Sequence, residues 1–188
     1  MHKYFITYKP YGYLSQFISN APKEQKKKFL SELYHFPERT MAVGRLDEKS
    51  EGLLLLTTDG KFSAEITSNK IEKEYYVQVD GIIEDTAIEH LQKGVSIGIK
   101  GKKYITKPAK VIRLSTTPKL PNRVKKIRDS RHGPTSWLSI TITEGKYKQV
   151  RKMTSAVGFP TLRLVRVRIG SFKIESLQPG EVKDIQIS

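Results

Sequence analysis

The sequence lacks several features that identify common classes of protein. It has no cysteine, which excludes disulfides, thiolate metal sites and a cysteine nucleophile. Its longest apolar run, residues 53–56, is far shorter than the roughly 18 residues needed to span a bilayer. The four histidines are scattered without the spacing of metal ligands, and neither a Gly-x-Gly-x-x-Gly motif nor a Walker phosphate loop occurs. We therefore expect a cytoplasmic protein without a metal or a nucleotide cofactor.

Acidic residues are scarce in only one half of the chain. The net charge is +15, yet residues 1–100 contain 14 Lys/Arg and 14 Asp/Glu. Residues 101–188 contain 20 Lys/Arg and 5 Asp/Glu, so they carry the whole excess. This separation favours a surface that binds a polyanion such as nucleic acid, although a basic and merely well-solvated surface has the same composition.

Hydrophobic periodicity predicts an α+β fold with a largely antiparallel sheet. Strands and helices alternate without a regular β-α-β rhythm, which is typical of this class. Alternating or apolar runs predict strands at residues 3–9, 40–44, 52–57, 74–79, 137–143 and 162–169, with two short strands between residues 95 and 112. Helical spacing predicts helices at residues 22–33, 61–67, 85–93 and 149–157, and residues 115–134 are expected to form a long loop.

The first candidate site is the segment GRLDEKSEG, residues 44–52, a loop with three carboxylates between two predicted strands. Rigid flanking strands suit a catalytic group, which must be held close to its productive geometry. An ion pair with Arg45 would keep the Asp47 carboxylate ionised. The same letters also fit an ordinary charged turn or a Mg²⁺ site, although no matching acidic cluster occurs elsewhere.

Two basic segments are candidate binding sites. In EGKYKQVRKM, residues 144–153, backbone N–H groups and four cations converge where a strand passes into a helix, which suits a phosphate or a carboxylate. The loop at residues 121–134 has several cations and the single acid Asp129, which suits contacts with an RNA backbone. A basic helix start on the surface and a disordered, solvated loop are the respective alternatives.

Together these segments resemble the RsuA family of pseudouridine synthases. GRLD at residues 44–47, SEGLLLLT at residues 50–57 and the following Asp59-Gly60 are similar to the catalytic motif of that family. KEYYV at residues 73–77 resembles its second motif, residues 144–153 resemble its third, and YKPYG at residues 8–12 is also typical.

Other segments resemble the E-type members that modify large-subunit (23S) ribosomal RNA. They are IRD at residues 127–129, PTSWL at residues 134–138 and VGFPTLRL at residues 157–164. Tyr147 and Lys148 stand where that subtype usually has Asn-Arg.

The resemblance implies a pseudouridine synthase fold. In this fold a largely antiparallel mixed sheet forms two lobes flanked by helices, with the catalytic cleft between them. The whole of residues 1–188 is expected to form this catalytic domain, with the lobe boundary near residues 60–70 and no S4-type domain at the N-terminus. The implied activity is the isomerisation of a uridine in ribosomal RNA without a cofactor. A monomer is the default expectation, since nothing in the sequence indicates an oligomer.

The resemblance also implies roles for individual residues. Asp47 is the essential carboxylate, Tyr75 stacks on the target uracil and accepts a proton at the sugar, and Arg151 pairs with Asp47. Leu164 packs beneath the uracil ring, and Arg45 acts when the nucleotide is extruded from its stack. The remaining expected contacts to RNA are Lys146, Lys148, Arg123, Arg128 and Arg131.

Three other functions fit parts of the sequence. A non-catalytic rRNA-binding protein explains the charge but not the rigid loop around Asp47. A metal-dependent RNA nuclease would require Mg²⁺ and would cleave the chain. Within the synthases, the alternative is a member that modifies small-subunit rRNA or a different large-subunit uridine.

Overall fold

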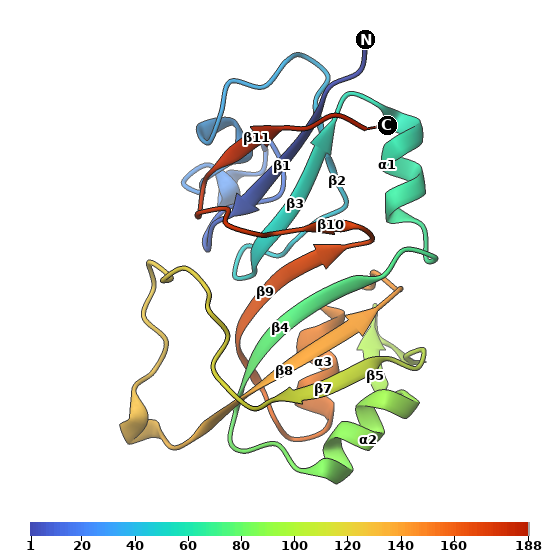
Figure 1. Ribbon diagram of the computed structural model, residues 1–188, viewed down its shortest axis with the longest axis vertical. Helices are drawn as coiled ribbons and strands as arrows, with labels where there is room; N and C mark the ends of the chain where they lie inside the picture. The colour runs from blue at the N-terminus through green and yellow to red at the C-terminus, as the bar shows by residue number, and fades with distance from the viewer. Residues whose placement is uncertain (188) are drawn as a thin grey trace.

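The computed structural model describes residues 1–187 of the chain (Figure 1). Its strands are β1 Tyr4–Lys9, β2 Met41–Val43, β3 Glu51–Thr57, β4 Lys73–Asp80, β5 Ser96–Ile99, β6 Lys102–Ile105, β7 Lys110–Leu114, β8 Thr135–Ile142, β9 Thr161–Ile169, β10 Phe172–Lys173 and β11 Val182–Asp184. Its helices are α1 Gly60–Thr67, α2 Asp85–Lys93 and α3 Gln149–Ala156. Short 3-10 turns are η1 Pro22–Glu24, η2 Leu30–Glu32 and η3 Ser130–His132.

A nine-stranded sheet runs through the molecule in the order β11-β1-β3-β9-β4-β8-β7, with β2 added to β3 and β10 to β9. The strands β5 and β6 form a separate hairpin. In the described chain every pair of named strands is antiparallel except β3 with β9. The predicted α+β class and largely antiparallel sheet are therefore confirmed.

The sheet has two halves that meet at β9 (Figure 1). The strands β1, β2, β3 and β11 lie in one half together with α1, whereas β4, β7 and β8 lie in the other with α2 and α3. The chain crosses into the second half after α1 and returns to the first with β10 and β11. The two halves are therefore not consecutive stretches of sequence.

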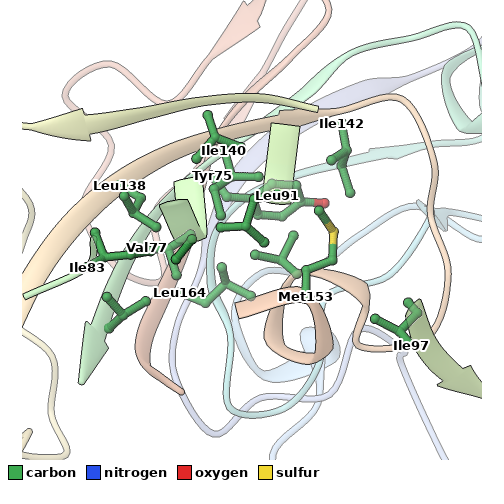
Figure 2. Packing of buried hydrophobic residues seen from close by; sticks show 14 of the residues in the cluster. Tyr75, Val77, Ile83, Leu91, Ile97, Leu138, Ile140, Ile142, Met153 and Leu164 are labelled. Atoms are coloured by element: carbon green, nitrogen blue, oxygen red, sulfur yellow. The ribbon is translucent and has the colours of Figure 1, made fainter. Parts of the chain in front are cut away.

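Each half has its own hydrophobic core. In the second half, apolar side chains of β4, β8, β9, α2 and α3 pack together, and Figure 2 shows Met153 projecting from α3 into this cluster. Tyr75 and Leu164 belong to the same cluster, on the side that faces the first half's loops. Smaller clusters around β1 and β3 form the core of the first half.

The strand β3 is the apolar run of the sequence, and all seven of its residues are buried between β1 and β9. Gly52 lies in the parallel contact with β9, where it pairs with Arg166, and has a φ of +109°. A Cβ atom added at Gly52 would lie 2.3 Å from the backbone oxygen of Arg166. Glycine is therefore the residue that allows β3 and β9 to approach this closely.

Most of the predicted elements are present, but one helix is not. Each separately predicted strand and the other three helices occur within two residues of the expected ends, while β7 is a third strand in a region where two were expected. The helix predicted at residues 22–33 is wrong, because the region forms only η1 and η2. The backbone N–H of Leu30 donates to Gln16 O (3.0 Å), and that of Leu14 donates to Lys28 O (2.9 Å). These bonds to residues 14–16 replace the helical pattern.

The predicted loop at residues 115–134 is also confirmed, interrupted only by η3. In residues 1–187 no helix is both long enough and apolar enough to cross a membrane.

Replacing Gly52 with alanine is expected to destabilise the protein by about 3 kcal/mol, because the methyl group would overlap the backbone of β9. Urea denaturation of the variant and the wild type measures the difference. Gly60→Ala is the control, since a Cβ atom at Gly60 meets nothing within 4 Å. Equal stability of Gly52→Ala and the wild type would contradict the close approach.

Candidate active site

A cavity of about 710 Å³ opens between residues 44–50, the strands β4 and β9, and the start of α3. It brings together residues that are far apart in the sequence. Six of the predicted site residues line it, namely Arg45, Asp47, Tyr75, Lys146, Lys148 and Leu164.

The backbone on both sides of Asp47 is held by hydrogen bonds. The buried Ser15 hydroxyl accepts a hydrogen bond from Leu46 N (2.9 Å) and donates one to Leu46 O (2.7 Å). After Asp47, Gly12 N donates to Glu48 O (2.8 Å), and Ser50 N donates to Asp47 O (2.9 Å). The carboxylate is therefore carried by a fixed turn, as a catalytic group requires.

Arg151 holds the same turn from the other side. Its guanidinium donates to Lys49 O (2.8 Å) and to the Ser50 hydroxyl (3.3 Å). Burial lowers the pKa of Arg151, and the nearby Asp47 carboxylate opposes that shift. Arg151 thus places a cation close to Asp47 without touching it.

The expected ion pairs of Asp47 with Arg45 and Arg151 are wrong for the described residues 1–187. The Arg151 guanidinium donates instead to Lys49 O and the Ser50 hydroxyl, and its Nε has no partner in the described chain, while Arg45 is exposed at the rim of the cavity.

Tyr75 and Leu164 form an apolar wall of the cavity. They lie on the neighbouring strands β4 and β9, and their exposed fractions are 8% and 4%. A β-bulge at Val167 interrupts the pairing, since Glu74 pairs with Arg168 and Tyr75 with Arg166. Because of the bulge, Arg166 and Ile169 both line the cavity, although residues three positions apart in a regular strand point to opposite faces.

Buried cations beneath the cavity were not anticipated from the sequence. Arg166 lines the cavity at 4% exposure, and its Nε donates to Leu53 O (2.8 Å), while its Nη2 has no partner in the described chain. Lys73 also lines the cavity and donates to three backbone oxygens, those of Ser68, Ile71 and Thr143. The one available signal was that arginines recur every two or three residues in an otherwise apolar strand.

Lys9 is a further buried cation near Asp47, with no exposed surface. Its ammonium donates to Pro10 O (3.0 Å) and Tyr13 O (2.7 Å). Burial lowers the pKa of Lys9 to about 7, although the carboxylates of Glu51 and Asp47 oppose the shift. Lys9 therefore ties β1 to the turn that follows it, directly behind the candidate site.

The segment between β8 and α3 is fixed by Glu144, which is buried at 2% exposure. Its carboxylate accepts hydrogen bonds from the Tyr104 hydroxyl, from Lys107 N and from Gln149 Nε2. Burial alone would raise the pKa of Glu144, but these hydrogen bonds lower it below its ordinary value. The exposed side chains of Lys146 and Lys148 extend from this framework at the cavity rim.

The three predicted loop arginines do not line the cavity, and each contacts another part of the protein instead. Arg128 forms a bidentate ion pair with Asp80, and Arg131 pairs with Asp129 (2.7 Å). The Arg123 guanidinium lies 4.6 Å from the centre of the Tyr11 ring and donates to a backbone oxygen of its own loop. The exposed cations of the loop at residues 115–134 are Lys119, Lys125, Lys126 and Arg131.

No group of three or more His, Cys, Asp or Glu side chains in residues 1–187 is placed to hold a metal ion. What the cavity offers instead is a fixed carboxylate, an apolar wall and several cations. This combination suits a planar, uncharged ring attached to an anionic backbone.

Comparison with known proteins identifies the family. A model of RNA pseudouridylate synthases matches residues 3–156, which is most of the chain. The chain belongs to the RNA pseudouridylate synthase family. It is an RNA pseudouridine synthase, an isomerase.

The sequence similarity to named relatives covers nearly the whole length of this synthase. The ribosomal large subunit pseudouridine synthase E of Vibrio parahaemolyticus is 43% identical over 98% of this chain and 74% of its own. The enzyme of the same name from Xanthomonas campestris is 45% identical over 92% of this chain and 90% of its own. A crystal structure of a pseudouridylate synthase matches with a TM-score of 0.75 at 30% identity, over 99% of this chain and 71% of the other. The predicted fold and family are confirmed.

Replacing Ser15 of the synthase with alanine is expected to lower the rate of the chemical step roughly tenfold, because the turn before Asp47 loses two hydrogen bonds. Single-turnover rates and RNA dissociation constants measure the two effects separately, and the affinity is expected to stay within about twofold. Ser19→Ala is the control, since that hydroxyl accepts only from Ala21 N at the surface. An unchanged rate would show that Ser15 does not position Asp47.

Proposed function

We propose that this synthase isomerises one uridine of large-subunit ribosomal RNA to pseudouridine, with Asp47 as the catalytic carboxylate. The observation that carries the proposal is the cavity, in which a rigidly held Asp47 faces the apolar wall of Tyr75 and Leu164. The choice of large-subunit RNA is supported by the two relatives of 43% and 45% identity that bear that name.

The proposed reaction rearranges bonds within a single nucleotide. The bond between uracil N1 and ribose C1′ breaks, a bond from C1′ to uracil C5 forms, and the hydrogen of C5 is released as a proton while N1 gains one. The product is an isomer of the substrate, so no electrons are gained or lost overall. Asp47 acts at the sugar, either by attacking C1′ or by starting an elimination.

The other residues of the cavity hold the nucleotide during this rearrangement. The Tyr75 ring stacks on the uracil, and Leu164, in the same wall, packs beneath the uracil ring. In the elimination route the proton that leaves the sugar is taken up by Asp47 and is returned to the sugar when the bond from C1′ to C5 forms, with the Tyr75 hydroxyl beside it. Arg151 supplies positive charge beside Asp47 as charge redistributes in the transition state. Arg45, exposed at the rim, contacts the RNA as the target nucleotide leaves its stack.

RNA affinity comes mainly from residues 101–188, which carry the excess positive charge. Lys146 and Lys148 at the rim, and Lys125 and Lys126 on the loop at residues 115–134, are exposed and available to phosphates. The ion pair of Arg128 with Asp80 fixes the loop that carries the last two lysines. We place this enzyme in the cytoplasm, where it acts as a monomer on ribosomal RNA.

Asp47→Asn is expected to reduce turnover by a factor on the order of 10⁴ or more, because an amide can neither attack the sugar nor take up a proton there. The dissociation constant for RNA should change by less than about threefold. Tritium release from a large-subunit transcript labelled at uridine C5, without added metal, measures turnover. The matched control is Glu48→Gln, the neighbouring carboxylate of the same turn, which pairs with Lys27. Activity of Asp47→Asn near the wild-type level would disprove the assignment.

Changing Lys125 and Lys126 together to glutamine is expected to weaken RNA binding and to flatten its salt dependence. Each lost phosphate contact lowers the slope of log K against log salt by roughly 0.7 to 0.9. Dissociation constants measured across a potassium chloride titration give that slope. The control pair is Lys23→Gln with Lys26→Gln, two exposed lysines in residues 1–100, the stretch without net charge. Identical slopes for wild type and the Lys125/Lys126 variant would remove this loop from the RNA surface.

A further inference from the structure

Tyr147 is a large aromatic side chain exposed at the rim of the cavity that contains Asp47. Its exposed fraction is 64%, and it lines the cavity from the segment between β8 and α3. Tyr75, by comparison, is almost fully buried in the wall of the same cavity. An exposed ring beside a binding cavity offers a surface on which an unpaired base can stack.

Lysines surround this ring. The Lys148 ammonium lies 4.9 Å and the Lys152 ammonium 5.2 Å from the centre of the Tyr147 ring. Close by in the sequence, the Lys146 ammonium lies 5.0 Å from the centre of the Tyr104 ring. Aromatic rings alternating with cations are typical of surfaces that bind single-stranded nucleic acid, where bases stack and cations contact the phosphates.

The segment that carries Tyr147 is rigid at both ends. Before it, Lys146 N donates to the buried Gln149 side chain (3.0 Å), which in turn donates to Glu144 (2.7 Å). After it, the Lys152 ammonium donates to Gly98 O (2.6 Å) in β5. The main chain that carries Tyr147 is therefore held in place before RNA binds, so less entropy is lost when a base stacks on the ring.

Lys148 adopts a backbone conformation that is also consistent with a binding site at this segment. Its φ of 50° and ψ of 32° lie in the left-handed region, which is unfavourable for a residue with a side chain. Strained conformations of this kind persist where the surrounding structure enforces them, often at binding sites. Here the hydrogen bonds of Gln149 and Glu144 enforce it, and the turn directs Tyr147 and Lys148 outward.

We propose that Tyr147 is a stacking platform for the unpaired base adjacent to the target uridine, with Lys148 and Lys152 contacting the phosphates on either side of that base. This inference rests on the proposed function, since it requires the target nucleotide to enter the Asp47 cavity. With the uridine inside, its neighbour in the chain reaches the rim, where the Tyr147 ring lies. Tyr147 then contributes to the choice of RNA site without taking part in the bond rearrangement.

The test uses a large-subunit RNA hairpin that contains the uridine mapped with the wild-type enzyme. Abasic nucleotides replace the base on the 5′ side or on the 3′ side of that uridine, one at a time. Tyr147→Leu is expected to raise the dissociation constant for the intact hairpin roughly tenfold, whereas Tyr147→Phe keeps the stacking surface and stays within about twofold of the wild type. On the hairpin that lacks the stacked base, wild type and Tyr147→Leu should bind equally.

Tyr34→Leu is the matched control, because Tyr34 is 46% exposed and does not line the cavity of Asp47. Single-turnover rates at saturating RNA should be the same for wild type and Tyr147→Leu, since the ring acts in binding. Thermal unfolding of each variant detects loss of fold.

Two results overturn the inference alone. Either Tyr147→Leu binds the intact hairpin as tightly as the wild type, or its loss of affinity persists undiminished on both abasic hairpins. In both cases the wild type still releases tritium, so the proposed function stands. A wild-type enzyme that released no tritium from large-subunit RNA would overturn the proposed function, and the stacking role with it.

Discussion

The buried ion pair between Glu51 and Arg163 is the contact on which the site depends. The two side chains are 1% and 7% exposed and are joined by hydrogen bonds of 2.9 and 3.0 Å. A buried pair is stable only when its remaining polar atoms are also satisfied, and here the Tyr8 hydroxyl and Pro121 O supply those partners. The pair thereby joins β3, β9, β1 and the long loop at one point. Because Glu51 directly follows the turn of Asp47, this junction fixes the carboxylate relative to the wall on β9.

Local patterns were sufficient for most of the sheet. The strand β3 is buried on both faces and is therefore a continuous apolar run, whereas β4 is buried on one face and therefore alternates. These two patterns identify both segments as strands. The helix predicted at residues 22–33 was wrong because the apolar spacing there is helical, whereas the backbone hydrogen-bond partners lie in residues 14–16. Local sequence patterns do not detect such partners. The pairing of β3 with β9, over a hundred residues apart, is likewise a property of the folded chain.

The motifs located Asp47, Tyr75 and Leu164, and the fold brings these three to one cavity. Sequence periodicity did not reveal the buried cations, since it assigns every arginine and lysine to the surface. Arg166 and Lys9 are buried because backbone oxygens lie within reach of them, which depends on tertiary structure. The opposite error occurred at Arg128, where a cation expected to face RNA stabilises its own loop through Asp80. A count of charges indicates a partner, but it does not show which charges are free to meet it.

The bulge at Val167 also limits how the length of this protein can vary. Successive residues of a strand point to opposite faces, so deleting the extra residue would restore regular alternation and turn Arg166 or Ile169 away from the cavity. Inserting one more residue at the bulge would likewise turn the side chains on one side of it to the opposite face of the sheet. The loop at residues 115–134 has no such register to keep between its contacts at Pro121 and Arg128. Insertions and deletions in divergent or engineered forms should therefore accumulate in that loop, while the number of residues in β9 stays constant.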